Sequence, residues 1–309
     1  MRAAQLLELA ACLAAGAWLD ARHGWSAAAI VAGTVAWFAG VRLALVCASS
    51  LLGWIFRSPR APAERIGAAA TVRLVAGEWR ALLAVNLVQI PWENLLMRPD
   101  PAPVTAERIP VVLVHGYFAN RGYFRPLVAR LEACGAGPVF VPNLRSWLAP
   151  IEAAEEGLDA AIERIVAGTG QPRVVLVGHS MGGLVARAYL ARRGSERIAR
   201  LVTVASPHHG TALARWGIGA SARQMREGSA FLAALEASEA AASVRVEAVS
   251  IYSPHDNMVA PQASSRLPWA RNVALPGLGH IAIAQSQALV RALLPELEAA
   301  GALAPQASA

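Results

Sequence analysis

The sequence predicts a doubly wound α/β domain, with a mostly parallel sheet flanked by helices, preceded by a helical region that crosses a membrane. From residue 109 onward, short runs of β-branched residues alternate with helical stretches, as is typical of a parallel sheet with right-handed crossovers. The chain is 55% hydrophobic, only 16% charged, and has a mean hydropathy of +0.40. This composition indicates that part of the chain lies in lipid.

Residues 1–56 are predicted to form a hydrophobic helical hairpin that anchors the protein in the membrane. Residues 26–56 exceed the roughly 20 residues that a spanning helix needs. Residues 3–19 are a marginal second span, because they are short, rich in alanine and contain Glu8. Arg42 would cost about 3 kcal/mol at the middle of the bilayer, and less if its side chain snorkels.

The arginines near this hairpin predict its orientation. Several follow the second apolar segment, beginning with Arg57 and Arg60, whereas only Arg22 lies between the two segments. The positive-inside rule therefore places the C-terminal domain in the cytoplasm. A secretory signal is the alternative interpretation, with Arg2 as its charged region and residues 3–19 as its apolar core.

Residues 57–108 are predicted to be a linker followed by an amphipathic helix. The linker begins with residues 57–62, a stretch rich in proline and arginine, and the helical pattern ends near Met97, before three prolines. Trp79 and Trp92 suit a helix that lies at a membrane interface or caps the next domain.

Residues 109–300 are predicted to be the α/β domain. Its strands are apolar throughout, as expected where helices cover both faces of a sheet. The predicted strands are 111–114, 139–141, 174–177, 201–204 and 244–251, and the predicted helices are 123–134, 151–167, 183–193 and 284–300. A disordered tail is predicted at residues 301–309.

A candidate nucleophile, Ser180, lies between a predicted strand and a predicted helix. The segment Gly178-His179-Ser180-Met181-Gly182 has the spacing of a sharp strand-to-helix turn, where glycines allow two backbones to approach and the serine is exposed at the apex. A glycine-rich turn with an incidental serine is the alternative. Because a run of four β-branched or leucine residues precedes the segment, we predict a nucleophile elbow.

A serine nucleophile needs a base to remove its proton and an acid to orient that base. Asp256 follows a strand predicted to end near residue 251, and His280 lies in a glycine-rich loop before the last predicted helix. Asp256 is preferred over Asp159, which the helical pattern places on a surface. His280 is preferred over His255, which is too close to Asp256 in sequence to face it easily.

Acyl transfer also needs hydrogen-bond donors for the developing oxyanion. The N–H of Met181, at the start of a predicted helix, is one candidate donor. The second is the N–H of Tyr117, in a loop that begins with His115 and Gly116 directly after the first predicted strand. A plain glycine turn is the alternative for His115-Gly116.

Other chemistries have less support. All basic residues are arginines, and no basic stripe alternates with aromatic residues, so no nucleic-acid partner is predicted despite a net charge of +7. His208 and His209 lack a third spaced ligand, and the three cysteines lie far apart, so no metal site and no disulfide framework are predicted. No organic cofactor and no obligate protein partner are predicted either.

With these motifs assembled, residues 109–300 resemble the bacterial triacylglycerol lipase and esterase branch of the α/β-hydrolases. Five segments carry the resemblance, in the order of that family: VVLVHGYF, VVLVGHSMGGLVAR, VTVASPHHGT, SPHDNMVAP and GLGH. The resemblance implies an α/β-hydrolase fold and a carboxylic ester hydrolase, with Ser180, Asp256 and His280 as its triad and Tyr117 and Met181 as oxyanion donors. The lipases of that family carry a lid in the region that corresponds to residues 211–243, and because this region is only moderately long and rich in alanine here, we expect a small lid.

The expected function is ester hydrolysis through an acyl-enzyme, on an ester or lipid substrate that membrane association keeps close. The anchor and the resemblance together place the protein at the bacterial inner membrane. Acyl transfer to an acceptor other than water and thioester hydrolysis are alternatives on the same scaffold. A noncatalytic membrane protein is a further alternative, although such a protein would not need a complete triad.

Overall fold

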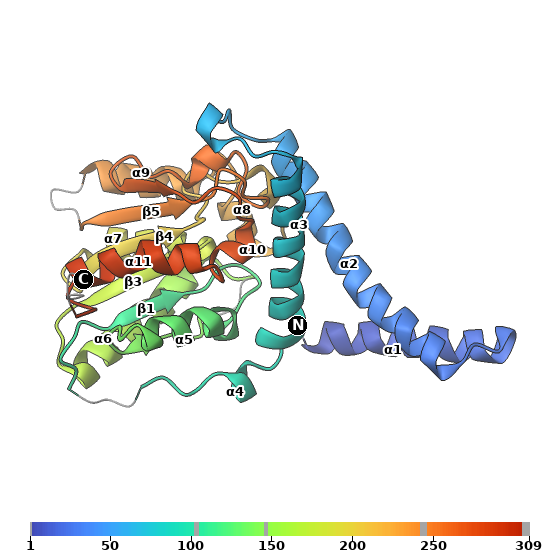
Figure 1. The fold of residues 1–309 in the computed structure, drawn as a ribbon. Helices are drawn as coiled ribbons and strands as arrows, with labels where there is room; N and C mark the ends of the chain where they lie inside the picture. Colours follow the sequence, from blue (N-terminus) through green and yellow to red (C-terminus); the bar gives the residue numbers. More distant parts are fainter. Residues whose placement is uncertain (1, 102–104, 145–147, 242–245, 305–309) are drawn as a thin grey trace.

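The computed structural model describes residues 2–101, 105–144, 148–241 and 246–304 (Figure 1). An N-terminal group of helices precedes an α/β domain, and Figure 1 shows α1 and α2 extending from that domain as an arm while α3 lies along its side. The N-terminal elements are α1 (Arg2–His23), α2 (Ala27–Ile55), η1 (Pro62–Glu64), α3 (Ala68–Leu83), the π-helical η2 (Ala84–Gln89) and α4 (Glu93–Leu96).

The two apolar segments form two helices joined by a short turn. Ser26 caps the second of them, α2, by accepting a hydrogen bond of 3.3 Å from the N–H of Ala29. Within the described residues, α2 is the one helix that is long and apolar enough to cross a membrane, judged by length and composition. The first helix, α1, does not meet that description.

Arg42 of α2 is paired inside the helical group. Its guanidinium donates to both carboxylate oxygens of Glu8 in α1, at 2.6 and 2.7 Å, and to the side-chain oxygen of Asn86 in η2. Only 6% of Arg42 is exposed. This bidentate ion pair offsets the cost of the buried charge and joins α1, α2 and η2.

The sheet of the α/β domain is entirely parallel. Its strand order is β2-β1-β3-β4-β5-β6. Strand β2 lies on one side of β1, and the chain then crosses to the other side of β1, where β3 to β6 follow in sequence order. This doubly wound order confirms the predicted fold class. The strands are β1 (Val111–Val114), β2 (Val139–Phe140), β3 (Val174–His179), β4 (Ile198–Val204), β5 (Ala248–Tyr252) and β6 (Arg271–Ala274).

Helices cover both faces of this sheet. The helices are α5 (Arg125–Ala133), α6 (Ile151–Thr169), α7 (Met181–Arg193), α8 (Gly219–Gln224), α9 (Ala230–Ala241), α10 (His280–Ile283) and α11 (Gln287–Ala299). Side chains alternate along each strand. Val111 and Leu113 of β1 therefore join the core under α5 and α11, whereas Val112 and Val114 join the core under α6 and α7.

Two ends of predicted elements differ from the structure. Ala302 and Leu303 are buried in the core under α11, so the start of the predicted disordered tail is wrong, and residues 305–309 lie outside the described residues. Strand β5 begins at Ala248 rather than at residue 244, and residues 242–245 lie outside the described residues. The edge strand β6 is largely exposed, which explains why it lacks the apolar run that marks the other strands.

Candidate active site

Ser180 sits at a strained turn between β3 and α7. Its backbone angles are φ 57° and ψ −126°, a region that residues other than glycine rarely adopt. A Cβ at Gly178 would lie 2.6 Å from the backbone of Gly182, and a Cβ at Gly182 would collide with the carbonyl oxygen of Val114. Both glycines are therefore required for the helix to pack so closely on the strands, and the turn has the geometry of a nucleophile elbow.

The structure brings Ser180, His280 and Asp256 into one chain of hydrogen bonds. The Nε2 atom of His280 lies 3.0 Å from the hydroxyl oxygen of Ser180, and its Nδ1 atom lies 2.8 Å from Oδ2 of Asp256. The other carboxylate oxygen of Asp256 accepts hydrogen bonds from the N–H groups of Met258 and Val259, at 2.7 and 2.8 Å. Both ring nitrogens of His280 and both carboxylate oxygens of Asp256 thus have hydrogen-bond partners, which fixes the orientation of the imidazole.

The charges around His280 stabilise its protonated form. Burial by itself lowers the pKa of His280, but the charge of Asp256, the hydrogen bond to Asp256 and the charge of Glu78 together outweigh it, so the pKa lies above its ordinary value of 6.5. His179 packs beside it, with ring centroids 4.9 Å apart, and burial holds the pKa of His179 well below the ordinary value. The neighbouring imidazole is therefore neutral, and His280 is the group that can take up a proton.

The loop after β1 lies directly against Ser180. A Cβ at Gly116 would be 2.9 Å from the Cβ of Ser180, so only glycine allows this approach. Burial lowers the pKa of His115 to about 4, and the neutral ring accepts a hydrogen bond from the N–H of Leu144 at Nε2 while Nδ1 donates to the carbonyl of Gly116. His115 thus fixes the backbone of the loop and does not face the serine as a second base.

The two predicted oxyanion donors follow the two residues that are in close contact: Met181 follows Ser180, and Tyr117 follows Gly116. Met181 is the first residue of α7 and follows Ser180 directly, at the positive end of the helix dipole. Tyr117 follows Gly116, and its hydroxyl donates to the carbonyl oxygen of Ile218 at 2.6 Å and accepts the N–H of Ile218 at 3.0 Å. The Tyr117 side chain therefore binds the segment predicted as a lid.

The remaining candidate histidines and Asp159 lie apart from Ser180. His208 is hydrogen-bonded to Thr203, His209 to Glu236, and His255 accepts the N–H of Gly277. Asp159 pairs with Arg193 on the surface of the domain. Within the described ranges, no group of three or more histidine, cysteine, aspartate and glutamate side chains could hold a metal ion.

Two further residues at this site were not identified from the sequence. Asn257 accepts the N–H of His280 at 2.9 Å and donates to the hydroxyl of Ser49 in α2 at 2.8 Å. Glu78 of α3 is fully buried beside His280. A signal for Glu78 did exist, because it falls on the buried stripe of α3 and η2 that contains Leu74, Ala81 and Val85.

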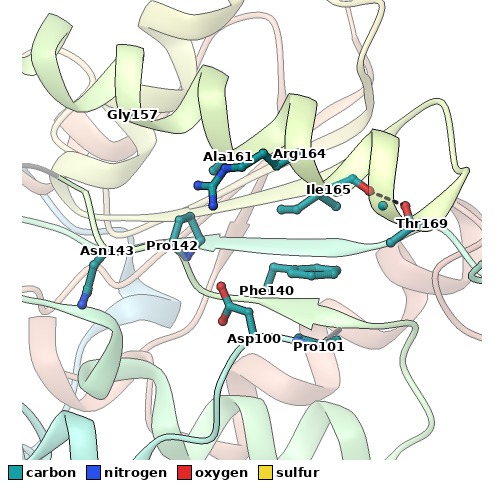
Figure 2. Close-up of a pocket in the computed structure, with 11 residues that line it drawn as sticks. Asp100, Pro101, Phe140, Pro142, Asn143, Gly157, Ala161, Arg164, Ile165 and Thr169 are labelled. Atoms are coloured by element: carbon teal, nitrogen blue, oxygen red, sulfur yellow. Dashed lines mark hydrogen bonds between the residues drawn. The ribbon is translucent and has the colours of Figure 1, made fainter. Parts of the chain in front are cut away.

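A cavity of about 710 Å³ opens onto Ser180 and His280. Its walls are mainly apolar and come from α2, α3, η2, the loop after β1 and the segment after β4. A second cavity, of about 510 Å³, lies between α6 and the end of β2 (Figure 2). Figure 2 shows Asp100 and Arg164 at that cavity, and Asp100 is already paired with Arg121 at 2.8 Å. Of the triad residues, Ser180 and His280 line the first of these two cavities, and the lining of the second includes neither of them.

Comparison with known proteins identifies the family of the α/β domain. Residues 109–288 match the family described as alpha/beta hydrolase fold, and the chain therefore belongs to the α/β-hydrolase family. The mature form of the lipase BlEst2 from Bacillus licheniformis superposes with a TM-score of 0.55 at 18% identity, covering 65% of this chain and 95% of that one, which indicates a shared fold. Residues 1–108 lie outside the family match.

Several curated relatives are similar over part of their length. The triacylglycerol lipase of Pseudomonas fragi is 37% identical over 143 residues, which are 41% of this chain and 48% of the relative. The triacylglycerol lipase of Burkholderia plantarii is 35% identical over 134 residues, or 39% of this chain and 37% of the relative. The lysosomal thioesterase PPT2 of Homo sapiens is 33% identical over 128 residues, which are 40% of this chain and 42% of the relative. The chain thus spans less than half the length of each of these relatives.

Proposed function

We propose that this protein is a serine hydrolase of carboxylic esters, with Ser180 as nucleophile, His280 as general base and Asp256 as the acid that orients the base. The single observation that carries the proposal is the hydrogen-bonded chain from Ser180 through His280 to Asp256, with Ser180 and His280 lining an apolar cavity. The strained elbow and the named lipase relatives support it.

In this mechanism His280 takes the proton of Ser180 while the serine oxygen attacks the ester carbonyl. The backbone N–H groups of Met181 and Tyr117 stabilise the oxyanion of the tetrahedral intermediate. His280 then gives its proton to the departing alcohol, which leaves an acyl-enzyme. Water, deprotonated by His280, attacks the acyl-enzyme and releases the carboxylic acid and free Ser180.

The test is turnover of p-nitrophenyl butyrate by the full-length protein in detergent micelles, with labelling of Ser180 by a fluorophosphonate probe. Both are expected, because an activated serine beside a neutral histidine reacts with either reagent. Absence of both would contradict the proposal and favour a noncatalytic membrane protein.

Thioester hydrolysis is a second candidate, because one group of relatives is named as lysosomal thioesterases. The same triad can attack either carbonyl, so the ratio of kcat/KM for an ester and a thioester of one acyl chain separates the two. Added alcohol that appears as a new ester product would instead indicate acyl transfer.

The proposal includes attachment to the bacterial inner membrane through α2, with the α/β domain in the cytoplasm. The length and composition of α2 and the arginines that follow it support this orientation. Protease treatment of spheroplasts, which exposes only the outer face of the inner membrane, should leave the domain intact. Digestion in intact spheroplasts would contradict the orientation.

We expect kcat/KM for ester hydrolysis to fall in acid with a midpoint above pH 6.5, the ordinary pKa of histidine. His280 must be neutral to accept the proton of Ser180, and its pKa is raised, so protonation removes activity at a higher pH than for a free imidazole. The measurement is kcat/KM for p-nitrophenyl butyrate between about pH 5 and pH 9. A midpoint below 6.5 would contradict the raised pKa.

A further inference from the structure

The cavity at Ser180 has a wall made by helices outside the family match. Its volume of about 710 Å³ lies in the range of roughly 300–1,000 Å³ found for small-molecule sites. The apolar residues that α2, α3 and η2 contribute are Leu45, Val46, Ala48, Leu52, Leu82 and Val85, and Ile90 follows directly after η2. The α/β-hydrolase domain therefore supplies the reacting groups, and the N-terminal helices supply much of the surface that a substrate would touch.

The polar groups in this wall are bound to one another. The Ser49 hydroxyl donates to the carbonyl of Val46 and accepts from Asn257, and the side-chain oxygen of Asn86 accepts from Arg42. Glu78 accepts backbone N–H groups of α10. With these hydrogen bonds made, the wall offers a substrate mainly hydrocarbon surface.

Large apolar side chains are also exposed around the cavity. Leu45 of α2 is 58% exposed, Phe118 is 41% exposed and Trp216 is 60% exposed, and all three line the cavity. The ring of Trp216 lies 6.4 Å from that of Phe56 at the end of α2. Such a group of exposed apolar residues marks a surface that binds an apolar partner.

We infer that α2, α3 and η2 form the acyl-binding wall of the site, and that the substrate is a membrane lipid whose ester carries a long acyl chain; this inference rests on the proposed ester hydrolysis. The helix that forms the wall is also the helix that is long and apolar enough to cross a membrane. An acyl chain can therefore move along the apolar surface of α2 from the bilayer into the cavity without crossing water.

A tryptophan at Ala48 tests the wall. Ala48 lies on α2 and lines the cavity, whereas Ala44, one helical turn earlier, is exposed and does not line it. The full-length protein in detergent micelles is assayed with p-nitrophenyl palmitate and p-nitrophenyl butyrate. We expect wild type to prefer palmitate in kcat/KM, and Ala48→Trp to lower the palmitate-to-butyrate ratio about tenfold by filling part of the cavity. Ala44→Trp should keep the wild-type ratio.

The outcomes separate this inference from the proposed function. A wild-type protein that hydrolyses butyrate without preferring palmitate would overturn the acyl-binding wall and leave ester hydrolysis standing. So would an unchanged ratio in Ala48→Trp, or an equal loss in Ala44→Trp. If wild type hydrolyses neither ester and resists fluorophosphonate, the proposed function fails, and the wall fails with it.

Glu78 of α3 is a fully buried carboxylate, with 0% of its surface exposed. Its carboxylate accepts the N–H of Ile281 at 2.9 and 3.1 Å, one distance to each oxygen, and the N–H of Ala282 at 2.8 Å. These groups belong to the first turn of α10, the short helix that begins with His280. A Cβ at Gly279 would collide with the same carboxylate, so the backbone before His280 is also in contact with it.

We infer that Glu78 is a positioning residue for His280: it holds the start of α10, and through it the imidazole, at the distance that Ser180 requires. A helix of four residues has few internal hydrogen bonds, so its first N–H groups depend on an outside acceptor. The N-terminal helices therefore take part in the alignment of the triad as well as in the wall of the cavity.

The test compares Glu78→Ala and Glu78→Gln with Glu155→Ala, which removes another fully buried glutamate far from His280, on α6. We expect Glu78→Ala to lower kcat for p-nitrophenyl butyrate about 100-fold with KM nearly unchanged, because misplacement of a reacting group acts on the chemical step. Glu78→Gln should recover about a tenth of wild-type kcat, because its carbonyl oxygen still accepts an N–H of α10. Glu155→Ala should lower the melting temperature without this loss of kcat.

A folded Glu78→Ala variant with wild-type kcat would overturn the inference, as would an equal change in kcat for Glu155→Ala. If Glu78→Ala does not fold, Glu78→Gln decides: a lower kcat at unchanged KM supports the positioning role, and a wild-type kcat overturns it.

Discussion

Ester hydrolysis by the Ser180→Ala variant is expected to fall by about a millionfold in kcat, to a level at which turnover is not detected in ordinary assays. Alanine removes the attacking oxygen while the rest of the site stays in place, so substrate binding should be retained. The measurement is hydrolysis of p-nitrophenyl butyrate together with fluorophosphonate labelling, and both signals should be lost together.

The control for this variant is Ser238→Ala, on the partly exposed surface of α9 and away from the cavity. It should keep wild-type turnover and labelling. If Ser180→Ala were still labelled or still hydrolysed the ester, a different nucleophile would have to act, and the mechanism proposed above would be incorrect.

Replacing Asp256 with asparagine is expected to lower kcat about ten-thousandfold. The oxygen of the asparagine can still accept the N–H groups of Met258 and Val259, so the loop should keep its shape. Its amide group would then face Nδ1 of His280 as a donor in place of the carboxylate. A donor there favours the tautomer that carries its proton on Nε2, and that nitrogen could no longer accept the proton of Ser180.

Asp159→Asn is the matched control, because it makes the same chemical change at a partly exposed aspartate paired with Arg193. Its kcat should stay within about twofold of wild type, since a surface ion pair contributes little. Similar kcat values for the two asparagine variants would contradict the role of Asp256. A large rise in KM at constant kcat for Asp256→Asn would also contradict it, because orientation of a base acts on the chemical step.

Much of the α/β domain could be predicted because its signals are local. A strand that helices cover on both faces must be apolar throughout, so β1 and β3 were visible as runs of valine and leucine. The elbow was visible because the approach of α7 to β1 and β3 excludes a Cβ at Gly178 and Gly182. The edge strand β6 was harder to delimit, since it is largely exposed and has no apolar run.

The contribution of the N-terminal helices to the site could not be predicted in the same way. The pattern of α3 indicates a buried stripe, and Glu78 falls on that stripe, but no local pattern names the partner that a buried carboxylate will find. Arg42 is likewise a charged residue in an apolar helix, and no local pattern names its partner. Its partner Glu8 lies 34 positions away in the chain, and only the packing of α1 against α2 brings the two together.

The alternation of strands and helices, the glycines of the elbow and the chemical types of Ser180, Asp256 and His280 can all be predicted from local sequence patterns. These features follow from steric and hydrophobic constraints that act over a few residues. Three other features depend on the packing of distant elements: His280 reaches Ser180 across 100 positions of the chain, Glu78 contacts the helix that begins with His280, and α2 forms one wall of the cavity. Contacts of this kind depend on how separate elements pack. A pattern of apolar residues indicates that a residue is buried, but it does not identify the residues that bury it.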